Sequence, residues 1–296
     1  MAVPLAFRTK SLTVLAEAPA MFYLIAGLSI RVEDVLSALL PQRMNIFSQT
    51  VSDYCEPLLH VKVSKRLFSS ITNENQRLLL HQWRECQIST LYLPDSGELL
   101  MEEAALDGSV DPVALQFGLM QSIRTVIGLL LLRQGGFIVH AAAVATPDHT
   151  LLFSGLSGAG KSTQALLWEK YGAADVINHD APMITCCNGR FYCHGNPWSG
   201  SVDCYKQTSS PVDYLLALSH GQENRLMPLD EKAALRFMLT QSLVRLQTDE
   251  DMALLVENMQ RFVQTVPMFH YACLPNRSAV YTLQNHLTSQ EDTHHA

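Results

Sequence analysis

A glycine-rich stretch in the middle of the chain carries the clearest chemical signal. GLSGAGKS, residues 155–162, fits the pattern G-x-x-x-x-G-K-[ST] in full. Glycines let backbone N–H groups wrap around phosphate oxygens, and a helix that starts after such a loop adds the positive end of its dipole. In this pattern Lys161 is expected to bridge the β- and γ-phosphates of a nucleotide, and the Ser162 hydroxyl to ligate Mg²⁺. The stretch predicts a nucleotide-binding loop that comprises Gly155, Ser157, Gly158, Ala159, Gly160, Lys161, Ser162 and Thr163.

A phosphate loop also needs an acid, which usually comes from the end of a neighbouring strand. Asp180 ends the strand-like run DVINHD and is the natural candidate, although an aspartate shortly before Pro182 is also typical of a plain turn. His140 lies in the run IVHAAAV, one predicted strand before the loop. A histidine there fits either a site residue or an ordinary core residue.

The segments around the loop follow an α/β pattern. FIVHAAAVA and LLFSG predict two strands that lead into the loop, and KSTQALLWEKYG predicts a helix that ends at Gly172. PMITCC and RFYCHG flank Asn188-Gly189, a pair that favours a type I′ hairpin turn. Before them, residues 111–134 predict a core helix with Asp111 as N-cap, followed by two glycines as its stop.

The rest of the chain carries no comparable motif. Residues 1–110 mix strand-like runs (LTVLAEA, LHVKVS, STLYLP) with helical stretches, which predicts an α+β region of unknown role. Residues 111–296 are expected to form the core domain, with the helix at 111–134 and the strands and loop at 137–163. DEKAALRFMLTQSLVRL has the spacing of an amphipathic helix that serves packing or a contact between copies of the chain, so a homo-oligomer is possible.

Composition narrows the classes of partner. The net charge of −7 and the absence of a basic block exclude a nucleic-acid partner. We expect no membrane partner, because the apolar run 126–132 is too short to span a bilayer, and we find no signal-peptide pattern at the start. Seven scattered cysteines predict reduced thiols and a cytoplasmic location. A zinc site is the weaker interpretation of the cysteines, because no C-x-x-C pair occurs among Cys186, Cys187, Cys193, His194 and Cys204.

Five features in order resemble the HPr kinase/phosphorylase and PEP-carboxykinase-like group, most closely its small stand-alone relatives. They are a histidine on a strand, the loop G-x-S-G-x-G-K-S-T, a strand that ends in an acid, a G-x-P-W-x-G segment and an ENRL-like element. Here these are His140, residues 155–163, Asp180, GNPWSGS at 195–201 and ENRL at 223–226. The resemblance covers His140 to about Leu229.

The resemblance implies an α/β fold with a nucleotide-binding core of mixed β-sheet, loop and helices, joined to the α+β N-terminal region. It implies transfer of a phosphoryl group from ATP, with Mg²⁺, to a hydroxyl. His140 and Asp180 would lie near the γ-phosphate, with Asp180 binding Mg²⁺ or taking the acceptor proton. Arg225 would meet developing negative charge, and GNPWSGS would lie near acceptor or nucleotide, where Trp198 either stacks or simply packs.

The chain departs from the family pattern at one position. Where HPr kinases have paired aspartates, this chain has His179-Asp180, so one carboxylate is missing. His179 could act as a base, since a neutral imidazole accepts a proton near pH 7, or it could face away from the site. The acceptor could be a serine of a small peptide or protein in a biosynthetic pathway, or a free metabolite. The missing carboxylate also leaves open a nucleotide-binding regulatory subunit, and a metabolic carboxykinase is a remote third function.

Overall fold

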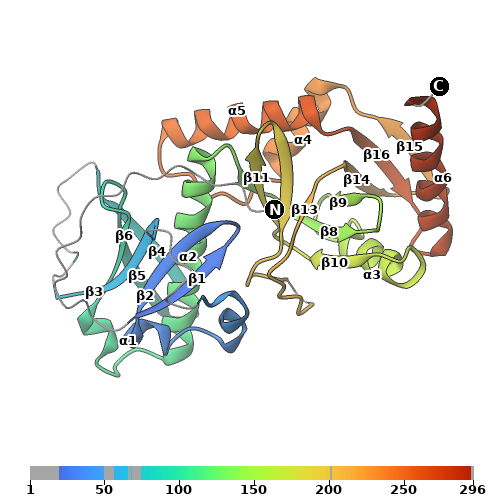
Figure 1. The fold of residues 1–296 in the computed structure, drawn as a ribbon. Coiled ribbons are helices and arrows are strands. Elements are labelled where there is room, and N and C mark those ends of the chain that lie inside the picture. Colours follow the sequence, from blue (N-terminus) through green and yellow to red (C-terminus); the bar gives the residue numbers. More distant parts are fainter. Residues whose placement is uncertain (1–19, 50–56, 66–67, 69–74, 201, 295–296) are drawn as a thin grey trace.

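The computed structural model describes residues 20–49, 57–65, 68, 75–200 and 202–294. Three β-sheets and the helices between them form a mixed α/β fold, as predicted. An N-terminal part built on one sheet lies beside a larger C-terminal part that contains the other two (Figure 1). The predicted strand at LTVLAEA falls outside the described residues.

The N-terminal sheet has six strands in the order β1-β2-β3-β6-β5-β4. β3 pairs in parallel with both of its neighbours, and the other pairs are antiparallel. The run LHVKVS forms β3, and STLYLP falls mainly in β5, so both predicted strands exist. The strands are β1 Ala20–Ile25, β2 Leu28–Glu33, β3 Leu59–Ser64, β4 Arg77–Trp83, β5 Cys86–Leu93 and β6 Glu98–Glu102, with the short helices α1 Asp34–Ser37, η1 Gln42–Phe47 and η4 Glu103–Leu106.

Helix α2 (Pro112–Arg133) covers one face of this sheet. Asp111 caps it by accepting a hydrogen bond from the Val113 N–H, as predicted. Ile123 and Ile127 share an apolar core with strands β1 to β6 and also with Ile138 and Ala181 of the C-terminal part. The helix therefore belongs to the core of the N-terminal sheet and at the same time contacts the second part.

Helix α2 is also long and apolar enough to cross a membrane, judged by length and composition only. It is the one such helix among the described residues. However, 72% of its most apolar window is buried inside the protein, which is the property of a core helix.

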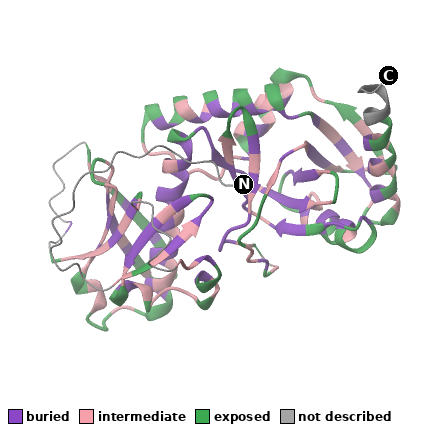
Figure 2. Cartoon of the chain, in the orientation of Figure 1, coloured by how far each residue is buried: buried purple, intermediate pink, exposed green. Residues whose placement is uncertain are grey.

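The second sheet has the order β10-β8-β9-β14-β16-β15, with β9, β14 and β16 parallel. Helices α4 and α5 pack on one face, and α3 and α6 pack on the other. Its central strands are buried (Figure 2). The bounds are β8 Ala141–Ala145, β9 Thr150–Ser154, β10 Asp175–Asn178, β14 Tyr214–His220, β15 Arg225–Pro228, β16 Met268–Cys273, α3 Lys161–Tyr171, α4 Glu231–Thr240, α5 Asp249–Thr265 and α6 Arg277–His294.

The third sheet contains the predicted hairpin. β11 (Met183–Cys187) and β12 (Arg190–His194) pair antiparallel around Asn188 and Gly189, whose φ values of 51° and 76° are those of a type I′ turn. β13 (Ser209–Pro211) and β7 (Phe137–Ile138) complete the sheet.

Two predicted elements differ from the structure. FIVHAAAVA is two strands, β7 and β8, which belong to different sheets and are separated at Val139 and His140. The helix predicted over 230–246 ends at Thr240. After it the backbone turns, because Ser242 bridges Val139 and the Leu243 N–H bonds the Ile138 carbonyl. These tertiary hydrogen bonds outweigh the helical spacing.

Candidate functional site

A cavity of about 310 Å³ lies where the glycine loop meets two other segments of the chain. One is the break between β7 and β8, and the other follows β10. Asp180 is the one carboxylate among the described residues that line this cavity. The lining residues are His140, Ser157, Gly158, Gly160, Lys161, Ser162, Thr163, His179, Asp180 and Gly200.

The glycine loop joins β9 to α3 and places the start of that helix at the cavity. Gly158 and Gly160 have φ values of 82° and 99°. An added Cβ would meet no atom within 4 Å at either position, so these glycines are required by backbone conformation and not by lack of space. No side chain caps the N-terminus of α3. Its first N–H groups, which have no acceptor within the helix, are therefore available to an anion.

Lys161 is the first residue of α3 and is 8% exposed. Its ammonium group donates to the carbonyls of Gly155 (2.9 Å) and Leu156 (3.2 Å), so it folds back over the loop that precedes it. Burial lowers the pKa of Lys161, and the negative charge of Asp180 opposes that shift. One of the three ammonium hydrogens remains for a ligand.

Asp180 and His140 meet across the cavity. The Ala141 N–H bonds the Asp180 carbonyl (3.1 Å), which fixes the two segments side by side. His140 Nε2 lies 3.5 Å from Asp180 Oδ1. The pKa of His140 is lowered, chiefly by burial and then by the charge of Lys161, while Asp180 acts in the opposite direction. His140 is therefore neutral near pH 7, with a nitrogen that can accept a proton.

Two buried asparagines hold the backbone around Asp180. Asn178 Oδ1 accepts from the N–H groups of Asp180 (2.9 Å) and Ala181 (2.8 Å), and its amide donates to the Trp198 carbonyl. Asn196 donates to the Ala181 carbonyl and accepts from the Trp198 N–H, both at 2.9 Å. Residues 178–181 are thereby tied to the GNPWSGS segment.

The same segment supplies Gly200, where side-chain space is missing. A Cβ at Gly200 would lie 3.0 Å from the Cβ of Asp180, so a larger residue here would require the Asp180 side chain to shift by a few tenths of an ångström. Trp198 is 6% exposed and packs in the core that α2 shares with the N-terminal sheet. It packs, and does not offer a stacking face to a ligand.

His179 lines the cavity and does not face away from it. It is 5% exposed, and its buried Nδ1 has no hydrogen-bond partner. Burial lowers its pKa, with a smaller opposing effect from Glu169. His179 is therefore a second neutral imidazole beside the single carboxylate.

The structure does not bring Arg225 to this site. Arg225 is exposed at the start of β15, the edge strand, which is three strand positions away from β9. At about 4.8 Å per strand, the separation is roughly 14 Å. Gly155 and Ala159 belong to the loop but do not line the cavity, whereas Ser157, Ser162 and Thr163 do.

Arg124 is a neighbour of the site that the sequence pattern did not indicate. It lies on α2, half-buried; burial lowers its pKa, the charge of Asp180 acts in the opposite direction, and its own charge contributes to lowering the pKa of His140. A signal was present in the sequence: Arg124 is the one charged residue of this helix before its last residue, Arg133.

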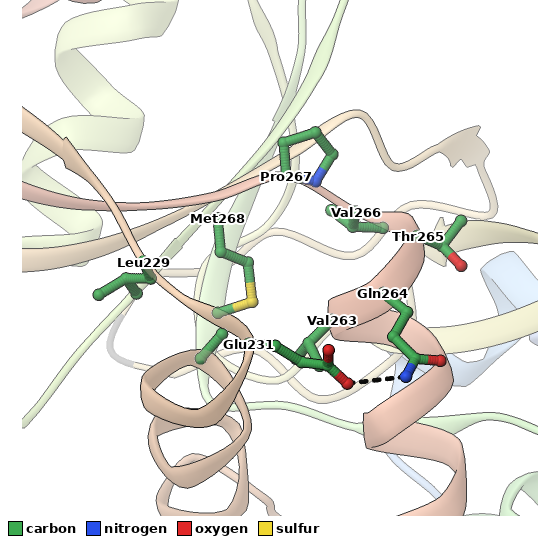
Figure 3. Close-up of a pocket in the computed structure, with 9 residues that line it drawn as sticks. Leu229, Glu231, Val263, Gln264, Thr265, Val266, Pro267 and Met268 are labelled. Carbon is green, nitrogen blue, oxygen red and sulfur yellow. Dashed lines mark hydrogen bonds between the residues drawn. The ribbon is translucent and has the colours of Figure 1, made fainter.

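A larger hollow of about 370 Å³ lies elsewhere, between the start of α4 and the end of α5 (Figure 3). The amide of Gln264 donates to Glu231 across it (2.7 Å). Its lining contains no lysine, arginine or histidine, so it lacks the positive groups that a phosphate needs. Within the described part of the chain, no group of three or more His, Cys, Asp or Glu side chains could hold a metal ion.

Comparison with known proteins gives similarities at the level of structure. No family model and no curated protein matches the chain. Among solved structures, it is similar to the HPr(Ser) kinase/phosphatase from Coxiella burnetii, with 16% sequence identity and a TM-score of 0.32. The match covers 52% of this chain and 98% of that chain. That protein is a member of the group that the sequence motifs resemble.

Proposed function

We propose that this protein is a phosphotransferase that moves the γ-phosphate of ATP, with Mg²⁺, to a hydroxyl acceptor. One observation carries the proposal. Lys161, Asp180 and His140 come from three separate segments and line one cavity at the uncapped start of α3. This set provides a cation for phosphate, a carboxylate for a metal ion and a neutral base in one place.

The donor set suits a nucleotide phosphate with a hard cation. The N–H groups at the start of α3 and the ammonium of Lys161 would bind phosphate oxygens. Ser162 and Asp180 would hold Mg²⁺, since hydroxyl and carboxylate oxygens are ligands that this ion prefers. When bound, Mg²⁺ supplies positive charge against the phosphate oxygens.

The acceptor hydroxyl must lose a proton during transfer. Its oxygen forms the new bond to the γ-phosphorus while the bond to the bridging oxygen breaks, and ADP leaves with that electron pair. We assign the proton to the imidazole of His140, which is neutral near pH 7. The carboxylate of Asp180, 3.5 Å away, stabilises the positive imidazole that results.

The test looks for phosphate on a product. Purified protein is mixed with ATP, Mg²⁺ and the short peptides encoded beside its gene, or with metabolite hydroxyl acceptors, and products are weighed by intact mass. We expect an added phosphate that is lost in Asp180→Asn and retained in Asp175→Asn. Asp175 is a matched control because its side chain is 70% exposed and pairs with Lys206 outside the cavity. Lys161→Ala with full transfer would refute the mechanism.

A second candidate is a nucleotide-binding regulatory subunit without transfer activity. The observation that favours it is the single carboxylate in the cavity, with His179 where the resembling kinases have a second acid. Paired acids divide metal binding and base chemistry between them, so the loss of one carboxylate weakens catalysis unless an imidazole takes over the base role. Binding of ATP·Mg²⁺ with no turnover on any acceptor would support this candidate.

A further inference from the structure

Arg124 lies on the face of α2 that packs behind the two segments carrying His140 and Asp180. Gly128, one turn further along the same helix, packs against β7 and Val244: an added Cβ would lie at ordinary contact distance, 3.5 Å from Ile138 Cδ1 and 3.4 Å from Val244 Cγ1. Ile123 and Ile127 share a core with Ile138 and Ala181. Ile138 is two residues before His140, and Ala181 directly follows Asp180. The helix therefore places Arg124 beside the two segments that carry His140 and Asp180, behind the residues that line the cavity.

The Arg124 guanidinium is half-buried but unpaired. No hydrogen bond or ion pair joins it to another residue in the ranges that the structure describes. Burial lowers its pKa, and the charge of Asp180 raises it again, so the two groups interact without being close enough to pair. A partly desolvated guanidinium keeps its charge and is costly to leave without an anion. An anionic ligand in the cavity would remove that cost.

Arg124 and Lys161 approach Asp180 from different elements. Lys161 comes from the loop side and is held by the loop carbonyls, whereas Arg124 comes from α2. An anion beside Asp180 and His140 would thus meet a second cation that the phosphate loop does not supply. The forked guanidinium matches two oxygens of one phosphoryl group, which a lysine ammonium does not.

We propose that Arg124 binds the phosphoryl group in transit from ATP to the acceptor, and stabilises its charge in the transition state. This inference rests on the proposed phosphotransferase function. It makes Arg124 a catalytic residue that acts on the transferred group, while Lys161 and the start of α3 hold the nucleotide that remains.

The test compares a ground-state ligand with a mimic of the transferred group. Affinity for ADP·Mg²⁺ is measured by calorimetry with and without aluminium fluoride, which occupies the place of the phosphoryl group. We expect wild-type protein to bind ADP more tightly with aluminium fluoride. Arg124→Gln should bind ADP within about twofold of wild type but lose roughly 100-fold in affinity for ADP with aluminium fluoride. Arg236→Gln, an exposed arginine of α4, should retain both affinities.

The outcomes separate this inference from the proposed function. Wild-type protein that does not bind ADP would overturn both. Arg124→Gln that keeps the gain from aluminium fluoride, or that weakens both ligands equally, would overturn the role of Arg124 alone. Arg124→Lys keeps the positive charge, and it replaces Arg124→Gln as the test variant if Arg124→Gln does not fold. In this variant the gain in ADP affinity from aluminium fluoride should be roughly tenfold smaller than in wild type, because lysine lacks the forked guanidinium.

Discussion

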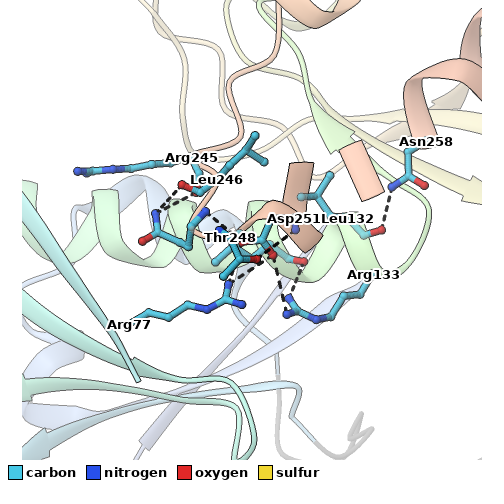
Figure 4. Close-up of polar contacts among 10 residues, drawn as sticks. Arg77, Leu132, Arg133, Arg245, Leu246, Thr248, Asp251 and Asn258 are labelled. Carbon is cyan, nitrogen blue, oxygen red and sulfur yellow. Dashed lines mark hydrogen bonds and ion pairs between the residues drawn. The ribbon is translucent and has the colours of Figure 1, made fainter. Parts of the chain in front are cut away.

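Replacement of Asp251 by alanine should destabilise the protein by about 3–5 kcal/mol, because Asp251 is a buried carboxylate that joins three elements. It lies in the first turn of α5 and is 0% exposed. Its Oδ2 accepts from Arg77 of β4 (3.1 Å) and from the Thr248 N–H (3.1 Å), two residues labelled in Figure 4, and also from the Gln247 N–H (3.0 Å). Arg133 of α2 lies 4.0 Å from its other oxygen.

The magnitude follows from what the substitution leaves behind. Two backbone N–H groups lose their acceptor, at about 1 kcal/mol each. Arg77, whose side chain is 11% exposed, keeps a partly buried charge without its carboxylate partner. An uncompensated buried charge accounts for most of the roughly 3–5 kcal/mol that loss of one member of such a pair costs.

Urea unfolding, followed by tryptophan fluorescence, measures the change in the free energy of unfolding. Asp249→Ala is the control, because Asp249 is exposed in the same turn of α5 and should cost less than about 1 kcal/mol. Adding Arg77→Met to Asp251→Ala should recover part of the loss, since it removes the unpaired charge. A loss below about 1 kcal/mol for Asp251→Ala would refute the reasoning.

Three further predictions concern the site and the buried histidines. Lys161→Ala should weaken ATP binding at least tenfold in calorimetry, because it removes the buried ammonium, whereas exposed Lys170→Ala should not. Asn196→Ala should lower kcat about tenfold with ATP affinity kept, because the backbone that holds Asp180 loses two hydrogen bonds; an unchanged kcat would contradict this. Burial lowers the pKa of both His81 and His194 to about 4, so the folded state takes up their protons less readily than the unfolded chain. Stability should be full above pH 6.5 and fall as the pH drops towards 4, by roughly 1–2 kcal/mol per imidazole between pH 7 and 5 in urea titrations, and His194→Gln should reduce that loss.

Local signals in the sequence are sufficient to predict the bounds of several helices and turns. The cap at Asp111 and the glycines after Arg133 bound α2 to within a residue, and Asn188-Gly189 forms the predicted turn. These features depend on backbone conformations that neighbouring residues determine. The break in FIVHAAAVA could not be read in this way, because it results from pairing with distant segments. Val139 bridges Ser242, and the His140 N–H bonds the Gln241 carbonyl.

The same distinction applies to the candidate site: local spacing predicts some of its residues, and tertiary packing determines the others. The loop motif predicts that Lys161 and Ser162 lie together, and both do line the cavity at the start of α3, because their spacing falls within one segment. Arg225 was expected near the phosphate only through a family resemblance, and its strand runs along the far edge of the sheet. Arg124 was missed for the opposite reason. Nothing in its own segment resembles a motif, and its relation to Asp180 arises from the packing of α2.

That packing gives the N-terminal sheet a part in the site. The core that buries α2 against β1 to β6 also contains Ala181 and Trp198. The backbone groups of these two residues form the hydrogen bonds with Asn178 and Asn196. Arg43 of η1 donates to the Pro197 carbonyl (2.9 Å), and its guanidinium lies over the Tyr205 ring. The backbone that holds Asp180 is therefore supported from the N-terminal side, while the loop that holds Lys161 is supported by β9 and α3. β10, which leads to Asp180, also packs with β9 and α3 through Val176, so the position of Asp180 depends both on the N-terminal core and on the core that supports the glycine loop.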